Sequence, residues 1–105
     1  MESNKKPTVF LLSGEVGAGK THWVKDFCRT QFGIDAVTSP TFTIVNQYRE
    51  DIFHLDLYRI ENEQELDFLN LEEILSNGNW VFVEWHCRLP KRFLVGLENI
   101  VRVQL

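Results

Sequence analysis

Residues 14–21 carry the feature that most constrains what this chain can fold into, because they match the pattern G-x-x-x-x-G-K-[ST] in full. Glycines in such a run let the backbone bend with its N–H groups pointing inward, and a helix that starts there adds unpaired N–H groups and the positive end of its dipole. A loop of this kind binds the phosphates of a nucleoside triphosphate, for which ATP is our first expectation. The expected contacts come from Gly14, Glu15, Val16, Gly17, Ala18, Gly19, Lys20, Thr21 and His22.

Two side chains of this loop have separate chemical roles. The Lys20 ammonium is expected to reach the β- and γ-phosphates and to assist catalysis by neutralising their charge, while the Thr21 hydroxyl is expected to bind Mg²⁺. An acid that completes the Mg²⁺ site usually lies at the end of a neighbouring strand. Asp56 and Glu84 each follow a mainly apolar run, so the residues alone leave both open as candidates.

Strand and helix patterns alternate along the rest of the chain, which predicts an α/β fold with a small, mostly parallel sheet flanked by helices. Continuous apolar runs are typical of strands buried on both faces, and the period of two near the C-terminus indicates a strand with one solvated face. The expected strands are Val9–Leu12, Val37–Tyr48, Ile52–Leu57, Trp80–Val83 and Val101–Leu105, and the expected helices are His22–Phe32 and Glu61–Asn77.

Local signals refine the ends of these elements. Gly33 stands where a helix usually stops. Pro40 interrupts the extended stretch, because the residue before a proline is pushed out of the helical region. Asn62, three residues before Glu65, resembles a helix cap, and Asn70 is a candidate break in the helix that follows.

Composition bounds the class of protein. The chain has 105 residues, 44% hydrophobic and 25% charged, so residues 1–105 are expected to form one domain. A net charge of −4 argues against autonomous nucleic-acid binding. The polar residues 1–7, which we expect to be disordered, lack the apolar region of a signal peptide, and no run reaches membrane-span length; we therefore expect a cytoplasmic protein without membrane contact. Cys28 and Cys87 are expected to be buried or half-buried thiols.

Three further stretches, in order and spacing with the glycine-rich loop, resemble the TsaE (YjeE) family. They are Thr38–Tyr48, Phe53–Arg59 and Val83–Trp85, and the resemblance covers about residues 8–86. That family is the ATPase component of the bacterial system that makes N6-threonylcarbamoyladenosine at position 37 of tRNAs. The resemblance implies a P-loop NTPase-like fold, Mg²⁺-dependent ATP binding and slow, partner-dependent hydrolysis. It also implies TsaD and TsaB as partners, with tRNA reached only through that complex.

The same resemblance implies roles for individual residues. Ser39–Thr41 would form a switch-type loop that senses the γ-phosphate. Asp56 or Thr41 would position the attacking water, with Asp56 also able to support the metal. Glu84 would be the second Mg²⁺ ligand after the threonine of the loop, and Trp85 would lie beside the nucleotide.

The sequence departs from the family pattern in two places. Only Met1–Pro7 precede the first expected strand, so we expect a domain without the family's usual N-terminal strand and helix. His86 follows Glu84 and Trp85 where the family usually has proline.

Two other functions stay open on the sequence. A small-molecule kinase would use Asp56 as the base for a substrate hydroxyl, but such enzymes need an acceptor pocket and an arginine-bearing lid, for which the chain after Glu84 has little room. A non-catalytic, nucleotide-dependent interaction module would bind ATP without releasing phosphate. The oligomeric state is also open.

Several other side chains have simpler interpretations. His54 is expected to be a packed or edge histidine rather than a base, and Trp23 and Trp80 are expected to pack in the core. The segment Tyr58–Arg59 suits a plain surface as well as a partner contact. Arg88–Arg92 is expected to be a solvated basic loop.

Overall fold

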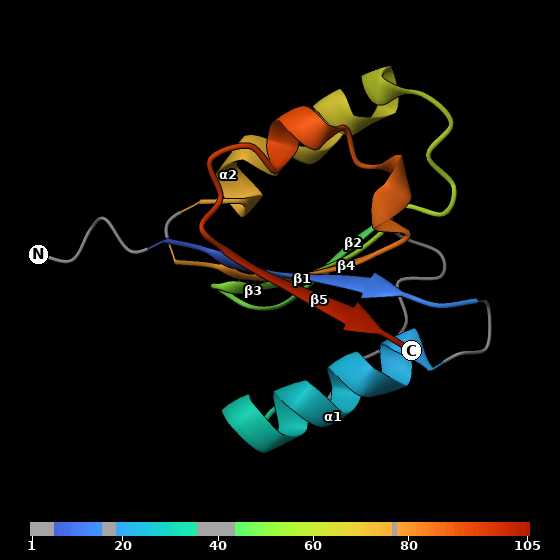
Figure 1. The fold of residues 1–105 in the computed structure, drawn as a ribbon. Helices are drawn as coiled ribbons and strands as arrows, with labels where there is room; N and C mark the ends of the chain where they lie inside the picture. The colour runs from blue at the N-terminus through green and yellow to red at the C-terminus, as the bar shows by residue number, and fades with distance from the viewer. Residues whose placement is uncertain (1–5, 16–18, 36–43, 77) are drawn as a thin grey trace, which may run out of the picture.

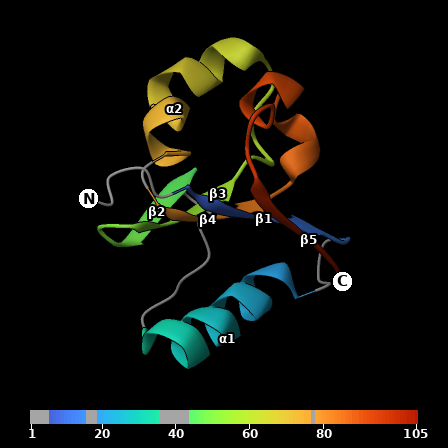
Figure 2. The same ribbon diagram turned by 60° about the vertical axis from the view of Figure 1, so that its left-hand side comes forward.

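A five-stranded sheet with helices on both faces forms the part of the chain that the computed structural model describes, residues 6–15, 19–35, 44–76 and 78–105 (Figures 1 and 2). Its order is β2-β3-β4-β1-β5. The edge strand β2 is antiparallel to β3, and the other pairs are parallel, so the predicted α/β fold is confirmed. The strands are β1 (Thr8–Ser13), β2 (Val45–Arg49), β3 (Ile52–Asp56), β4 (Trp80–Glu84) and β5 (Asn99–Gln104).

The helices divide unequally between the two faces of the sheet (Figure 2). Helix α1 directly follows the glycine-rich loop and, among the described residues, is the helix that covers one face, while short helices cover the other. The helical segments are α1 (Lys20–Phe32), α2 (Leu71–Ile74) and the 3₁₀ turns η1 (Glu63–Leu69), η2 (His86–Arg88) and η3 (Lys91–Phe93).

Strands β1 and β4 are central because their side chains are apolar on both faces, as the sequence predicts. In the parallel register, Glu84 lies opposite both Leu12 of β1 and Asp56 of β3. The carboxyl ends of three strands therefore meet at one edge of the sheet, where the glycine-rich loop leaves β1.

The core against α1 is rich in aromatic rings. Phe10 stacks on Phe82 at 4.9 Å between ring centroids, and Phe27 of α1 meets both rings. Trp23 and Trp80 pack at the margins of this cluster, which confirms their predicted packing role. The opposite core, under the short helices, is aliphatic and includes Leu11, Leu55, Leu57, Leu66, Leu71 and Val83.

The expected helix over Glu61–Asn77 is divided at Asn70, the residue that the sequence gives as its candidate break. Asn70 adopts the left-handed conformation, with φ of 55°, and separates η1 from α2. Asparagine tolerates this backbone because its short side chain is polar. The predicted cap is confirmed, since the Asn62 side chain accepts from the Glu65 N–H and the Glu65 side chain accepts from the Asn62 N–H.

The basic segment at 88–92 is solvated as expected, since Arg88, Lys91 and Arg92 are exposed, but it belongs to two 3₁₀ turns and Leu89 is buried. Arg88 donates to the Ile60 carbonyl over 2.8 Å, and Arg92 pairs with Glu63 at 2.6 Å on the surface.

Strand β2 and the N-terminal residues also differ in part from the sequence predictions. Strand β2 begins at Val45, and residues 37–43 of the expected strand lie outside the described residues. Lys6 pairs with Glu98 at 2.8 Å and Pro7 is buried, while residues 1–5 lie outside the described part.

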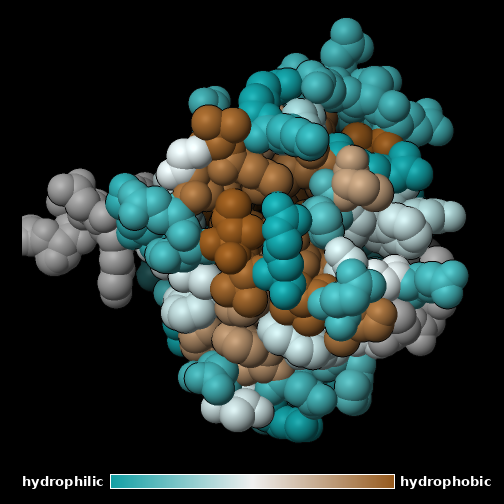
Figure 3. Space-filling model, viewed as in Figure 1, coloured by the Kyte–Doolittle hydropathy of each residue, from teal (hydrophilic) through white to brown (hydrophobic). Residues whose placement is uncertain are grey.

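Apolar side chains gather around the edge strand β5 between polar upper and lower surfaces (Figure 3). Across the described residues, no helix combines the length and apolar character of a bilayer span.

The aromatic core predicts the effect of a truncation. Phe82→Ala removes a fully buried ring from β4, and we expect it to lower the free energy of unfolding by about 3–5 kcal/mol. The matched control is Phe68→Ala, because Phe68 is 87% exposed and its loss should change the same quantity by less than about 0.5 kcal/mol. Urea denaturation of both variants measures this, and equal losses would show that the ring cluster does not stabilise the fold.

Candidate nucleotide-binding site

The glycine-rich loop enters α1 through a backbone conformation that favours glycine. Gly19 is the residue before the helix and has a φ of 93°, in the left-handed region. The N–H groups of Lys20, Thr21 and His22 lie in the first turn of α1, where no carbonyl four residues earlier in the helix can accept from them. The described end of the loop therefore presents donors suited to phosphate oxygens.

Lys20 is held over the loop although its side chain is largely buried. Its ammonium donates to the carbonyls of Gly14 at 2.6 Å and Glu15 at 3.3 Å, and lies 4.8 Å from the centre of the Trp85 ring. These contacts keep a positive charge at the carboxyl edge of the sheet. The Trp85 ring therefore lies beside the ammonium of the loop lysine.

Thr21 and Glu84 meet directly, although 63 residues separate them. The Thr21 hydroxyl donates to Glu84 Oε2 over 2.8 Å, and Glu84 is only 4% exposed. Burial raises the pKa of Glu84, but hydrogen bonds from His54 and Thr21 and the charge of Lys20 outweigh it, so the pKa lies below its ordinary value. A hydroxyl beside an ionised carboxylate is a donor set that fits Mg²⁺, which prefers oxygen ligands.

Asp56 lies beside this pair and has a different environment. It ends β3 opposite Glu84, is half-buried, and accepts from the Tyr58 N–H over 3.0 Å. Burial raises the pKa of Asp56, and the charge of Glu84 adds to the increase. The contact with Thr21 therefore favours Glu84 as the metal ligand, and the raised pKa of Asp56 suits a group that exchanges protons.

His54 is the residue whose contact the sequence interpretation missed. It is fully buried, as a packed histidine would be, but its Nε2 lies 2.6 Å from Glu84 Oε2 and its Nδ1 lies 2.7 Å from the Tyr48 hydroxyl. The alternation of side chains along β3 and β4 could have indicated the contact between His54 and Glu84. His54 and Asp56 share one face of β3, and Glu84 lies on the same face of β4, toward α1.

Other predicted site residues have varied positions. Val16–Ala18 of the loop and Ser39–Thr41 lie outside the described residues. The His22 ring is exposed and pairs with Asp26 at 3.2 Å on the surface of α1, so only its backbone is placed to meet a phosphate. Trp85 has a φ of 59°, an uncommon conformation for a bulky residue, and its ring meets Tyr58 at 4.8 Å.

A small cavity adjoins the loop at the end of β1. It measures about 230 Å³, and its lining includes Gly14, Trp85 and the Ser13–His86 pair, whose Oγ and Nε2 are 2.8 Å apart. Burial lowers the pKa of His86, and the charge of Arg102 adds to the decrease. Cys87 also lines the cavity.

The two cysteines differ in environment. Cys28 is buried as expected, and burial raises its pKa to about 11. Cys87 is exposed, which corrects the expectation of a buried or half-buried thiol.

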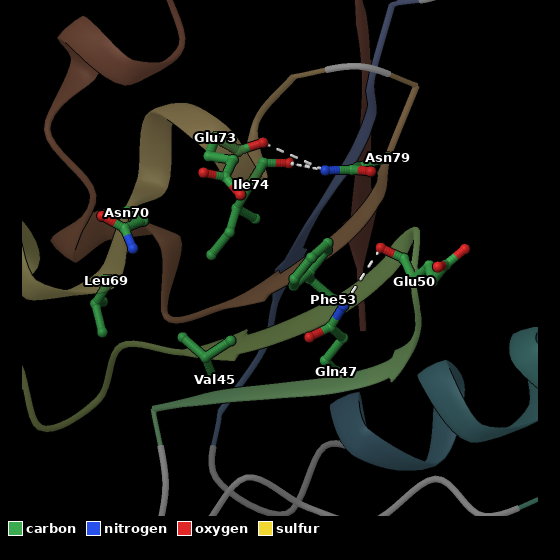
Figure 4. Close-up of a pocket in the computed structure, with 9 residues that line it drawn as sticks. All are labelled: Val45, Gln47, Glu50, Phe53, Leu69, Asn70, Glu73, Ile74 and Asn79. Carbon is green, nitrogen blue, oxygen red and sulfur yellow. Dashed lines mark hydrogen bonds between the residues drawn. The ribbon is translucent and has the colours of Figure 1, made fainter.

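A larger hollow of about 430 Å³ lies elsewhere, between the β2–β3 hairpin and α2 (Figure 4). Phe53 and Val45 project into it from the strands, and the Asn79 amide bonds to the carbonyls of Glu73 and Ile74 at its rim. It contains none of the predicted site residues.

The fold and this edge of the sheet together define a P-loop nucleotide-binding domain. Among the described residues, no group of three or more His, Cys, Asp or Glu could hold a metal ion. The family described as "Threonylcarbamoyl adenosine biosynthesis protein TsaE" matches residues 1–105. The chain belongs to the TsaE family.

Individual relatives agree with this assignment. The chain is 35% identical over 108 residues to the tRNA threonylcarbamoyladenosine biosynthesis protein TsaE of Rickettsia conorii, covering 94% of this chain and 61% of that one. It is 42% identical over 91 residues to the protein of that name from Synechocystis, covering 80% and 57%. The crystal structure of Bacillus subtilis YdiB superposes with a TM-score of 0.61 and 25% identity, covering 95% and 61%. The chain thus spans about three-fifths of the length of these relatives.

The contacts of Lys20 predict the effect of removing its ammonium group. Lys20→Ala should weaken ATP binding about 10- to 100-fold, because a hydrogen bond to a charged group contributes about 1.5–3 kcal/mol. Lys25→Ala, an exposed position on the same helix, is the control and should bind as the wild type does. Isothermal calorimetry measures both, and unchanged affinity in Lys20→Ala would refute the loop assignment.

Proposed function

We propose that this chain binds ATP with Mg²⁺ and hydrolyses it slowly, as the ATPase component that supports a TsaD–TsaB complex in threonylcarbamoyladenosine modification of tRNA. The observation that carries this proposal is the Thr21–Glu84 contact beside the buried ammonium of Lys20. The family membership and the names of the relatives support the link to tRNA modification.

The residues divide the chemistry among them. Lys20 and the N–H groups at the start of α1 would bind and neutralise the phosphates. Thr21 and Glu84 would hold Mg²⁺, which when bound offsets the charge that develops on the β- and γ-phosphate oxygens. Trp85 would lie beside the nucleotide, because its ring already packs on the lysine of the loop.

The attacking water needs a group that orients it and takes its proton. Asp56 is placed next to Glu84 at the edge of the sheet, and its raised pKa favours proton uptake relative to an ordinary aspartate. Thr41 remains the second candidate. No arginine is an obvious arginine finger: Arg88 and Arg92 bond to the Ile60 carbonyl and to Glu63, and exposed Arg59 is the candidate that could serve. We therefore expect slow intrinsic turnover that a partner accelerates.

Binding and kinetic measurements should distinguish the proposed roles of the Glu84 and Asp56 carboxylates. Glu84→Ala should abolish most of the Mg²⁺ dependence of ATP binding, because Thr21 loses its acidic partner. Asp56→Asn should leave Mg²⁺-ATP affinity near that of the wild type but lower kcat about 10²- to 10⁴-fold, the range for loss of a general acid or base.

A matched control for this experiment is Asp67→Asn, at an exposed position of η1. Calorimetry gives the affinities, and a phosphate-release assay gives kcat. Full Mg²⁺-dependent activity in Glu84→Ala would contradict the metal assignment. ATP binding without phosphate release by the wild type, even with partners, would favour the non-catalytic interaction module.

The partner role has its own test. Tagged chain should retain TsaD and TsaB on an affinity resin in the presence of Mg²⁺-ATP and lose them when EDTA replaces Mg²⁺. Lys20→Ala should retain neither. Absence of any nucleotide-dependent complex would contradict the partner assignment while leaving the nucleotide site intact.

A further inference from the structure

A continuous set of hydrogen bonds runs from β2 to the start of α1. The Tyr48 hydroxyl lies 2.7 Å from His54 Nδ1, and His54 Nε2 lies 2.6 Å from Glu84 Oε2. The same Oε2 accepts from the Thr21 hydroxyl over 2.8 Å. We infer that His54 is a positioning residue that orients the Glu84 carboxylate for Mg²⁺ binding, an inference that rests on the proposed role of Glu84.

The carboxylate decides the direction of one bond in this set. An ionised carboxylate only accepts, so His54 Nε2 carries the hydrogen that points to Glu84. The Tyr48 hydroxyl, which can donate or accept, meets the other ring nitrogen, Nδ1. Tyr48 and Glu84 thereby hold the imidazole ring at both of its nitrogens.

The geometry at Glu84 restricts rotation of the carboxylate. Both donors, one from α1 and one from β3, meet Oε2, and no other described residue donates to Oε1. One oxygen is therefore held from two sides, which fixes the direction in which the carboxylate faces. Partners of metal-ligating side chains commonly act in this way, and their loss costs about 10- to 100-fold in metal affinity.

Simple packing does not account for His54. The side chain is 0% exposed, and an apolar residue would fill the same space without the cost of desolvating an imidazole. An apolar neighbour would, however, leave the buried Glu84 carboxylate with one donor fewer. The histidine is thus placed to keep an ionised acid oriented in a dry environment.

The test compares nucleotide affinity with and without Mg²⁺, using a fluorescent non-hydrolysable ATP analogue. In His54→Leu, the ratio of the affinity in Mg²⁺ to that in EDTA should fall about 10- to 100-fold, while the affinity in EDTA stays within about twofold of wild type. His54→Gln can place an amide N–H toward Glu84 and should restore most of the ratio. Thermal unfolding checks that each variant is folded.

Each result decides a separate point. A wild-type ratio in folded His54→Leu, or an equal loss in His54→Gln, would overturn the inference. If His54→Leu does not fold, Tyr48→Phe decides, since removing one hydroxyl should lower the ratio about 2- to 10-fold; an unchanged ratio would overturn the inference. If the wild type itself gains nothing from Mg²⁺, the proposed function fails and the inference falls with it.

Discussion

The rest of the site depends on the two hydrogen bonds that Glu84 Oε2 accepts, one from Thr21 and one from His54. They join α1 through Thr21, β3 through His54 and β4 through Glu84 itself. A buried carboxylate without donors would be costly and would tend to take up a proton. Here the hydrogen bonds and the nearby Lys20 outweigh burial and hold the pKa of Glu84 below its ordinary value, which favours the ionised acid.

The sheet order explains why these groups meet. Strand β4 lies between β1, which leads into the phosphate loop, and β3, which carries His54 and Asp56. Parallel pairing ends all three strands at one edge, and alternation directs the relevant side chains toward α1. The aromatic packing between β1, β4 and α1 fixes the distance from Thr21 to Glu84, so the core and the site share the same elements.

The sequence predicts the loop, the central strands and α1, because each depends on local residue pattern. The α1 prediction began two residues late, since His22 was taken as the first helical residue and Lys20 is. The candidate break at Asn70 is confirmed, but the sequence does not predict that the part before it is a 3₁₀ turn and the part after it a short α-helix.

Strand pairing was harder to predict, because register depends on tertiary packing. The choice between Asp56 and Glu84, and the contact of His54 with Glu84, both follow from that pairing. Alternation along β3 and β4 could have placed His54 and Glu84 on one face, but only the register makes them neighbours. The roles of all the proposed site residues, Lys20, Thr21, Thr41, Asp56, Glu84 and Trp85 as well as residues 16–18, stay predictions.

The most direct test of the central claim is a crystal structure of the chain with Mn²⁺ in place of Mg²⁺ and a non-hydrolysable ATP analogue, with the metal located by its anomalous scattering. The account predicts a metal ion bound directly by Thr21 Oγ1, at roughly 2.0–2.2 Å, and by Glu84 either directly or through one bound water. A metal ion bound away from both residues, or held by Asp56 instead of Glu84, would contradict it.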